Sequence, residues 1–146
     1  MNGGKSGTER AEKLLKEGGY TCVLEKDGRI FTSTERGIRP LIRLLDEGAD
    51  FKGGFAADKI VGKAAAFLYV RLGIGGLYAD VLGKGGRSLL EAHGIPVRFG
   101  ALAERIINRA GTDLCPMEKA TEGISDPEEA ERALRKKLEE LRSDAL

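Results

Sequence analysis

Two segments of the chain place lysines where a helix is expected to begin, and both suit the binding of an anion. In the first, Asp58 opens an apolar stretch that ends at Val70, with Lys59 and Lys63 four residues apart. The stretch 57–70 is apolar on every side, which predicts a buried helix with Asp58 as its N-cap. Lysines at the start of such a helix repel each other and oppose the helix dipole, so we expect an anion beside them.

The second segment consists of Lys84, Gly85, Gly86 and Arg87, where another helix is expected to start and to end near residue 93. Free amides at a helix N-terminus bind phosphate or carboxylate, and glycines let the backbone approach the ligand. The spacing is not that of a P-loop. The alternative is that the glycines only turn the chain and that the lysines of both segments extend into solvent.

A third candidate is Cys115, at the expected start of a short helix, where a thiolate is favoured. Glu118 follows three residues later and could close back on the helix cap or move protons. Asn108 lies in the loop before them. The alternative is a packed cysteine next to a proline that starts a helix. Cys22, in an expected strand, is assigned to the core.

The composition limits the class of protein. With 146 residues, one domain is expected, and a net charge of +1 gives no general attraction to nucleic acid or to a membrane. The chain has no long apolar run and no signal-peptide pattern, so we expect a soluble cytoplasmic protein. Two cysteines and one histidine are too few for a dedicated zinc site, and no cofactor or metal is expected.

The order of the expected elements predicts an α/β domain with a small mixed sheet that is covered on both faces. A disordered leader (1–7) precedes the domain (8–146). The expected elements are helix 9–17, hairpin 20–32 turning at Asp27-Gly28, helix 38–47, helix 57–70, strand 74–82, helix 85–93, strand 96–99, a helical segment 101–108, a short helix from 115 and a charged C-terminal helix 126–142.

Three motifs together resemble the small prokaryotic family known as domain of unknown function 1893. They are FTSTERGIRPL at 31–41, ADKIVGKAAA at 57–66 and INRAGTDLCPME at 107–118. The resemblance extends from about residue 8 to residue 133. It implies a cytidine-deaminase-like fold, a three-layer α/β/α sandwich, and brings no established activity.

The resemblance also implies a departure from true deaminases, in which two core helices begin with zinc ligands and a catalytic glutamate. The matching positions look like Asp58-Lys59 and the segment 84–87, which offer neither thiolate nor imidazole, so zinc-dependent deamination is not expected. In this fold the two helix N-termini meet at the pocket. The resemblance would therefore bring Lys59, Lys63 and the basic residues of segment 84–87 together.

The first hypothesis for function is a pocket for a small anionic or nucleotide-like ligand. In its enzymatic version, Cys115 is the nucleophile, a nearby lysine lowers its pKa, and Asp58 or Glu118 moves protons. The alternative is a non-catalytic ligand sensor or interaction module that kept the fold and lost deaminase chemistry. A third possibility is a scaffold with solvent-facing lysines. Deaminase-like folds often associate, which makes a homodimer plausible.

Overall fold

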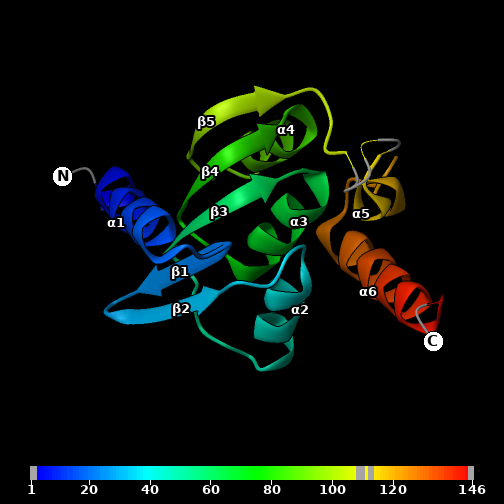
Figure 1. Ribbon diagram of the computed structural model, residues 1–146, viewed down its shortest axis with the longest axis horizontal. Coiled ribbons are helices and arrows are strands. Elements are labelled where there is room, and N and C mark those ends of the chain that lie inside the picture. Colours follow the sequence, from blue (N-terminus) through cyan, green and yellow to red (C-terminus); the bar gives the residue numbers. More distant parts are fainter. Residues whose placement is uncertain (1–2, 108–110, 112–113, 145–146) are drawn as a thin grey trace.

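The structure, a computed structural model, describes residues 3–107, 111 and 114–144 and contains a five-stranded mixed sheet (Figure 1). The strand order is β2-β1-β3-β4-β5; β1 is antiparallel to both of its neighbours, and β3, β4 and β5 are parallel. The strands are β1 Cys22–Lys26, β2 Arg29–Ser33, β3 Phe55–Val61, β4 Gly76–Gly83 and β5 Val97–Ala103. The helices are α1 Gly3–Gly18, α2 Arg39–Asp46, α3 Lys63–Leu72, α4 Lys84–Ala92, α5 Pro116–Ala120 and α6 Pro127–Asp144.

Helices cover both faces of the sheet. A small cluster on one face joins α1 to the strands through Val23, Ala57 and Tyr78. The larger core lies on the other face, where α2, α3 and α4 pack (Figure 1). The α/β class and the small mixed sheet predicted from the sequence are thus confirmed.

The predicted buried helix 57–70 is wrong in its first half. Residues 55–61 form β3, Gly62 ends the strand, and α3 begins at Lys63. Ala, Asp and Lys are poor strand formers, so local preference favours a helix here. Pairing with β1 and β4 at the centre of the sheet overrides that preference. Asp58 is therefore a strand residue and not an N-cap, and Lys59 and Lys63 lie on different elements.

The hairpin prediction is confirmed. β1 and β2 pair from Cys22 to Ser33 around the turn at Asp27 and Gly28. Both turn residues have positive φ, 48° and 84°, as a two-residue hairpin turn of this hand requires.

Two further boundaries differ from the prediction. The helix α1 begins at Gly3, inside the segment expected to be a leader. The expected helical segment 101–108 is wrong, because residues 101–103 complete β5 and Ile107 forms a single bridge with Leu114. Parallel pairing with β4 explains the longer strand. No helix in the described part of the chain is long and apolar enough to cross a membrane.

Candidate functional site

The N-terminus of α3 holds a carboxylate of the protein itself. Glu118, from α5, accepts hydrogen bonds from the backbone amides of Lys63 (3.0 Å, to Oε1) and Ala64 (2.8 Å, to Oε2). A helix N-terminus has free amides and a positive dipole end, both of which stabilise a negative group. The sequence predicted an anion near Lys63, and the structure shows that Glu118 occupies this position.

The residue before α3 must be small for this contact to form. A Cβ atom added to Gly62 would lie 2.2 Å from Oε1 of Glu118, which is closer than two unbonded atoms can approach. Gly62 therefore lets the carboxylate reach the amides of the first helical turn. We call the amides of Lys63 and Ala64, with Gly62 before them, the α3 mouth.

The second predicted segment lies beside the α3 mouth. The helix α4 begins at Lys84 as expected, and a Cβ atom added to Gly86 would lie 2.8 Å from the carbonyl oxygen of Gly62. Gly85 is exposed, and its Cβ would lie 3.6 Å from Cβ of Lys63. The two helix N-termini predicted to bind an anion are thus neighbours, and Gly86 allows their backbones to pack closely.

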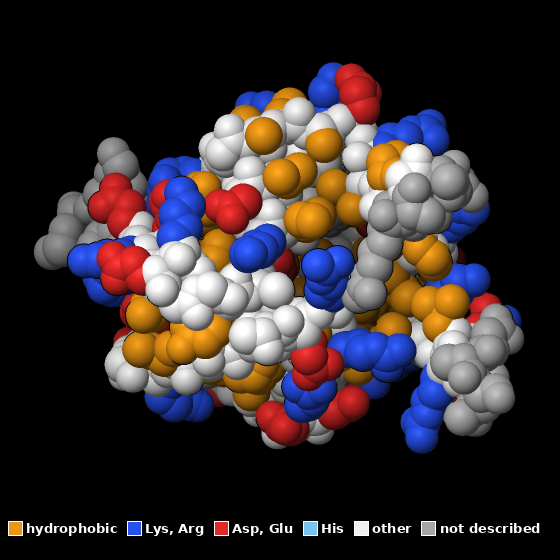
Figure 2. Space-filling model, in the orientation of Figure 1, with side chains coloured by type: hydrophobic (Ala, Val, Ile, Leu, Met, Phe, Trp, Pro, Cys, Tyr) orange, Lys and Arg blue, Asp and Glu red, His pale blue; other side chains and the backbone are white. Residues whose placement is uncertain are grey.

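The predicted basic side chains each have a different environment. Lys84 pairs with Glu104, and Arg87 contacts Glu91 at 3.4 Å. The amine of Lys63 lies 5.7 Å from the centre of the Phe67 ring. Lys59 is exposed, and within the described residues its side chain has no ion pair. In Figure 2, the basic side chains of the viewed face lie in several separate places, while hydrophobic atoms gather where Figure 1 draws β4 and β5.

Asp58 belongs to a chain of polar side chains between the sheet and α3. Its Oδ2 accepts a hydrogen bond from the hydroxyl of Tyr69 (2.7 Å), and the same hydroxyl lies 3.3 Å from Sγ of Cys22. Its Oδ1 accepts one from the backbone amide of Ile60 (3.3 Å). Tyr69 is 0% exposed and Cys22 4% exposed. Asp58 is half-buried, and these contacts join β1, β3 and α3 at one point.

Burial controls the ionisation of this chain. Loss of hydration raises the pKa of Asp58 from 3.8 to about 7, although the hydrogen bonds from Tyr69 and from the strand backbone act in the opposite direction. Burial also raises the pKa of the Cys22 thiol and of the Tyr69 hydroxyl, and the nearby Asp58 charge adds to both shifts. Near neutral pH, Asp58 is therefore the member of the chain that gains or loses a proton.

Replacing Tyr69 with phenylalanine should raise the pKa of Asp58 above about 7. The phenol hydrogen bond favours the ionised carboxylate, and the substitution removes it without changing the ring. A carbon-13 NMR titration of the Asp58 carboxyl group measures the midpoint. An unchanged or lower midpoint would show that this hydrogen bond does not stabilise the charge.

The predicted catalytic set is distributed over separate parts of the site. Cys115 is half-buried at the start of α5, its backbone amide bonds the carbonyl of Ile106, and its side chain packs against the main core. Within the described residues its thiol has no hydrogen bond to Asp58, Lys59 or Glu118. The predicted ligand residue Asn108 lies outside the described residues.

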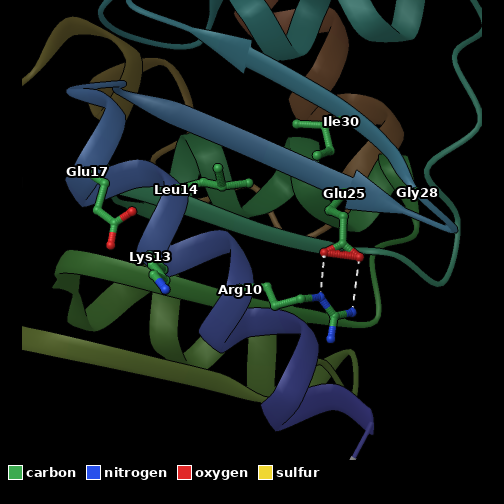
Figure 3. A pocket seen from close by; sticks show the side chains of 7 residues that line it. All are labelled: Arg10, Lys13, Leu14, Glu17, Glu25, Gly28 and Ile30. Carbon is green, nitrogen blue, oxygen red and sulfur yellow. Dashed lines mark hydrogen bonds and ion pairs between the residues drawn. The ribbon is translucent and has the colours of Figure 1, made fainter.

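An open groove of about 480 Å³ lies elsewhere on the molecule, between α1 and the β1–β2 hairpin (Figure 3). The guanidinium of Arg10 donates two hydrogen bonds of 3.1 Å to the carboxylate of Glu25, from Nε to Oε2 and from Nη2 to Oε1. Glu25 is 8% exposed, so this pair neutralises a buried acid. We assign the contact a structural role.

Comparison with known proteins identifies the family. Residues 10–138 match the family model TM1506, a domain of unknown function (DUF1893). The chain belongs to the DUF1893 family. No curated protein matches the chain.

The solved structure of another DUF1893 protein, TM1506 from Thermotoga maritima, has the same fold. It superposes with a TM-score of 0.84 at 26% sequence identity and covers 91% of this chain and 90% of the other. A diaminohydroxyphosphoribosylaminopyrimidine deaminase/5-amino-6-(5-phosphoribosylamino)uracil reductase from the same organism gives a TM-score of 0.42 at 21% identity, covering 66% and 36%. At that TM-score the likeness carries no inference about the activity of this DUF1893 protein.

Sequence reasoning missed Tyr69 and Cys22 as partners of Asp58. One signal was present, because a tyrosine in an otherwise apolar helix needs a partner for its hydroxyl. The partner could not be identified while residues 57–70 were expected to form one helix. In the structure of this protein, the side chain of Tyr69 extends from α3 to β3, the strand that precedes it.

Proposed function

We propose that this DUF1893 protein binds a small ligand with an oxyanion group at the α3 mouth, and that the ligand exchanges with the carboxylate of Glu118. One observation carries the proposal: both oxygens of a carboxylate bind the amides of Lys63 and Ala64. The same donors and the same dipole would hold a phosphate or carboxylate group of a ligand.

The position in the sheet supports this proposal. The α3 mouth follows the carboxyl end of β3, and α4 begins beside it at the carboxyl end of β4. In open α/β sheets, ligands bind outside the carboxyl ends of the strands. Lys59 and Lys63 lie on either side of Gly62 in the chain and supply positive charge to this edge.

Ligand binding without a covalent step agrees best with the contacts of Cys115. Its thiol has no hydrogen bond to an acid or base among the described residues, and Glu118 is engaged by two amides. We therefore favour the sensor version of the function over a Cys115-dependent enzyme. A Cys115→Ser variant should bind the ligand as the wild type does.

Replacing Glu118 with glutamine tests the exchange. Glutamine keeps the size of the side chain but loses the charge, so the α3 mouth should become a better site for an external anion. With sulfate as the probe, we expect roughly tenfold tighter binding, and without sulfate a loss of stability of about 1 kcal/mol. Sulfate titrations followed by the NMR signals of the Lys63 and Ala64 amides, with thermal unfolding, measure both effects.

Glu122→Gln is the matched control, because Glu122 is an exposed glutamate in the turn after α5. It should leave stability and sulfate affinity unchanged. If Glu118→Gln lowers stability but sulfate affinity stays at the wild-type level, Glu118 is a permanent cap and the proposed binding function is refuted.

A further inference from the structure

The carboxylate of the half-buried Asp58 has no cationic partner among the described residues. Three elements place polar or charged groups near it: Cys22 on β1, Tyr69 on α3 and Asp80 on β4, whose charge also raises the pKa of Asp58. On its own strand, Lys59 is exposed. A buried charge is normally paired or bound to a metal, so an unpaired carboxylate needs an explanation.

Charges on the opposite face of the sheet do not supply the partner. Three ion pairs are described on α1, Arg10 with Glu25, Lys16 with Glu12 at 2.9 Å and Arg98 with Glu12, and none of them includes Asp58. Within the described part of the chain, no group of three acidic, histidine or cysteine side chains could hold a metal ion. Among the described residues, the titratable groups that act on Asp58 are therefore Cys22, Tyr69 and Asp80.

Two rigid elements connect Asp58 to the α3 mouth. Along β3, Asp58 accepts the amide of Ile60, and Gly62 follows two residues later. Along α3, the helix that donates the Lys63 and Ala64 amides also carries Tyr69, which donates to Asp58. Three residues of strand lie between Asp58 and Gly62, so the two Cα atoms are about 13 Å apart.

We propose that anion binding at the α3 mouth is coupled to protonation of Asp58, so that the site binds its ligand together with a proton. When Asp58 is neutral, it does not weaken the attraction of the positive end of α3 for an anion. When Asp58 is ionised, its negative charge on β3, hydrogen-bonded to α3, repels an anion at the α3 mouth. This inference rests on the proposed function of the α3 mouth. A pKa of about 7 for Asp58 means that the coupling operates near neutral pH.

The expected size follows from the charge separation. One additional negative charge about 13 Å away, at the effective dielectric of a protein, changes the affinity of a singly charged anion by roughly tenfold and that of a doubly charged one by roughly a hundredfold. Because Asp58 is only partly ionised at pH 6 and at pH 8, the affinity ratio between these two pH values is roughly tenfold for a doubly charged anion. Sulfate is the suitable probe, because it stays doubly charged between pH 6 and pH 8, whereas inorganic phosphate changes its own charge in this range.

The first experiment measures sulfate affinity at pH 6 and pH 8 from the Lys63 and Ala64 amide signals of the full chain. The wild type should bind roughly tenfold more tightly at pH 6, and Asp58→Asn should bind equally at both values. His93 is the chain's one histidine, lies exposed at the end of α4, and could produce a pH dependence of its own. His93→Gln should retain the full difference. Equal affinities in the wild type, or a dependence that persists in Asp58→Asn, would overturn the inference.

A second experiment needs no external ligand and separates this inference from the proposed function. Glu118 is itself a singly charged anion at the α3 mouth. The factor by which Glu118 favours the folded state in the unfolding equilibrium should therefore be roughly fivefold smaller at pH 8 than at pH 6. Comparing wild type with Glu118→Gln, each with and without Asp58→Asn, isolates this coupling. If Glu118 shows the coupling but sulfate never reaches the α3 mouth, the proposed function fails and the link to Asp58 stands. If Glu118 contributes equally at both pH values, the link fails.

Discussion

Asp58→Asn is expected to remove a decline in stability that the wild type shows between about pH 4 and pH 7. The pKa of Asp58 is raised in the folded protein from 3.8 to about 7. Between these two values the folded state keeps the proton and the unfolded state has lost it. The folded state therefore binds more protons, and its free energy of unfolding falls as pH rises.

The direction of this effect is opposite to that of a salt-bridged carboxylate. The stabilisation is fully present below about pH 4, is lost as pH rises toward about 7, and is constant above that because both states are then ionised. The slope is about 1.4 kcal/mol per pH unit, so the difference over the whole window reaches at most about 4 kcal/mol. Asparagine has no charge to lose and can still accept the Tyr69 hydroxyl.

Urea unfolding of both proteins at half-unit steps from pH 4 to pH 8 measures the difference directly. Subtracting the two profiles removes the contribution of every other titrating group, because these groups are common to both proteins. A difference that stays flat between pH 4.5 and pH 6.5 would show that Asp58 ionises normally in the folded state.

Gly86→Ala is the second large effect, with an expected loss of about 2–3 kcal/mol. The added Cβ would lie 2.8 Å from the carbonyl oxygen and 2.9 Å from the carbonyl carbon of Gly62. These are backbone atoms at the end of β3, so they cannot move aside as a flexible side chain would. The helix α4 must shift away from the α3 mouth, and this strain exceeds the gain in helix propensity from alanine.

Gly85→Ala is the matched control for this prediction. Gly85 is exposed in the same turn of α4, and its Cβ would meet only Cβ of Lys63 at an ordinary 3.6 Å. We expect this variant to be neutral or up to about 1 kcal/mol more stable. Chemical denaturation of the two variants gives the comparison, and similar stabilities for both would mean that the α3–α4 packing tolerates a methyl group at position 86.

The predictions for Asp58→Asn and Gly86→Ala both concern residues near the α3 mouth. Gly86 sets how closely α4 approaches Gly62, and Asp58 lies deeper on the strand that ends there. The Glu118 carboxylate joins both to α5. A ligand that replaced Glu118 would release the contact between α5 and α3, which gives the proposed sensor function a structural consequence.

Local patterns were sufficient for the hairpin and for the start of α4. Asp27 and Gly28 can adopt the positive φ of a tight turn, so strand pairing followed from neighbouring residues. The start at Lys84 followed from a glycine-rich segment after a buried strand. The helix predicted over residues 57–70 was wrong in its first half because alanine, aspartate and lysine locally favour a helix, and only pairing with β1 and β4 makes residues 55–61 a central strand.

The sequence alone determined the α/β class, the family resemblance and the expectation of an anion near Lys63, because these depend on residue types and on periodicity. The tertiary structure decided which anion is there and which groups surround Asp58. Glu118 is far from Lys63 in the chain, and Tyr69 and Cys22 come from two other elements, so their contacts with the site exist only after the sheet and α3 have packed. The shift in the pKa of Asp58 has the same origin, since removal of water depends on burial.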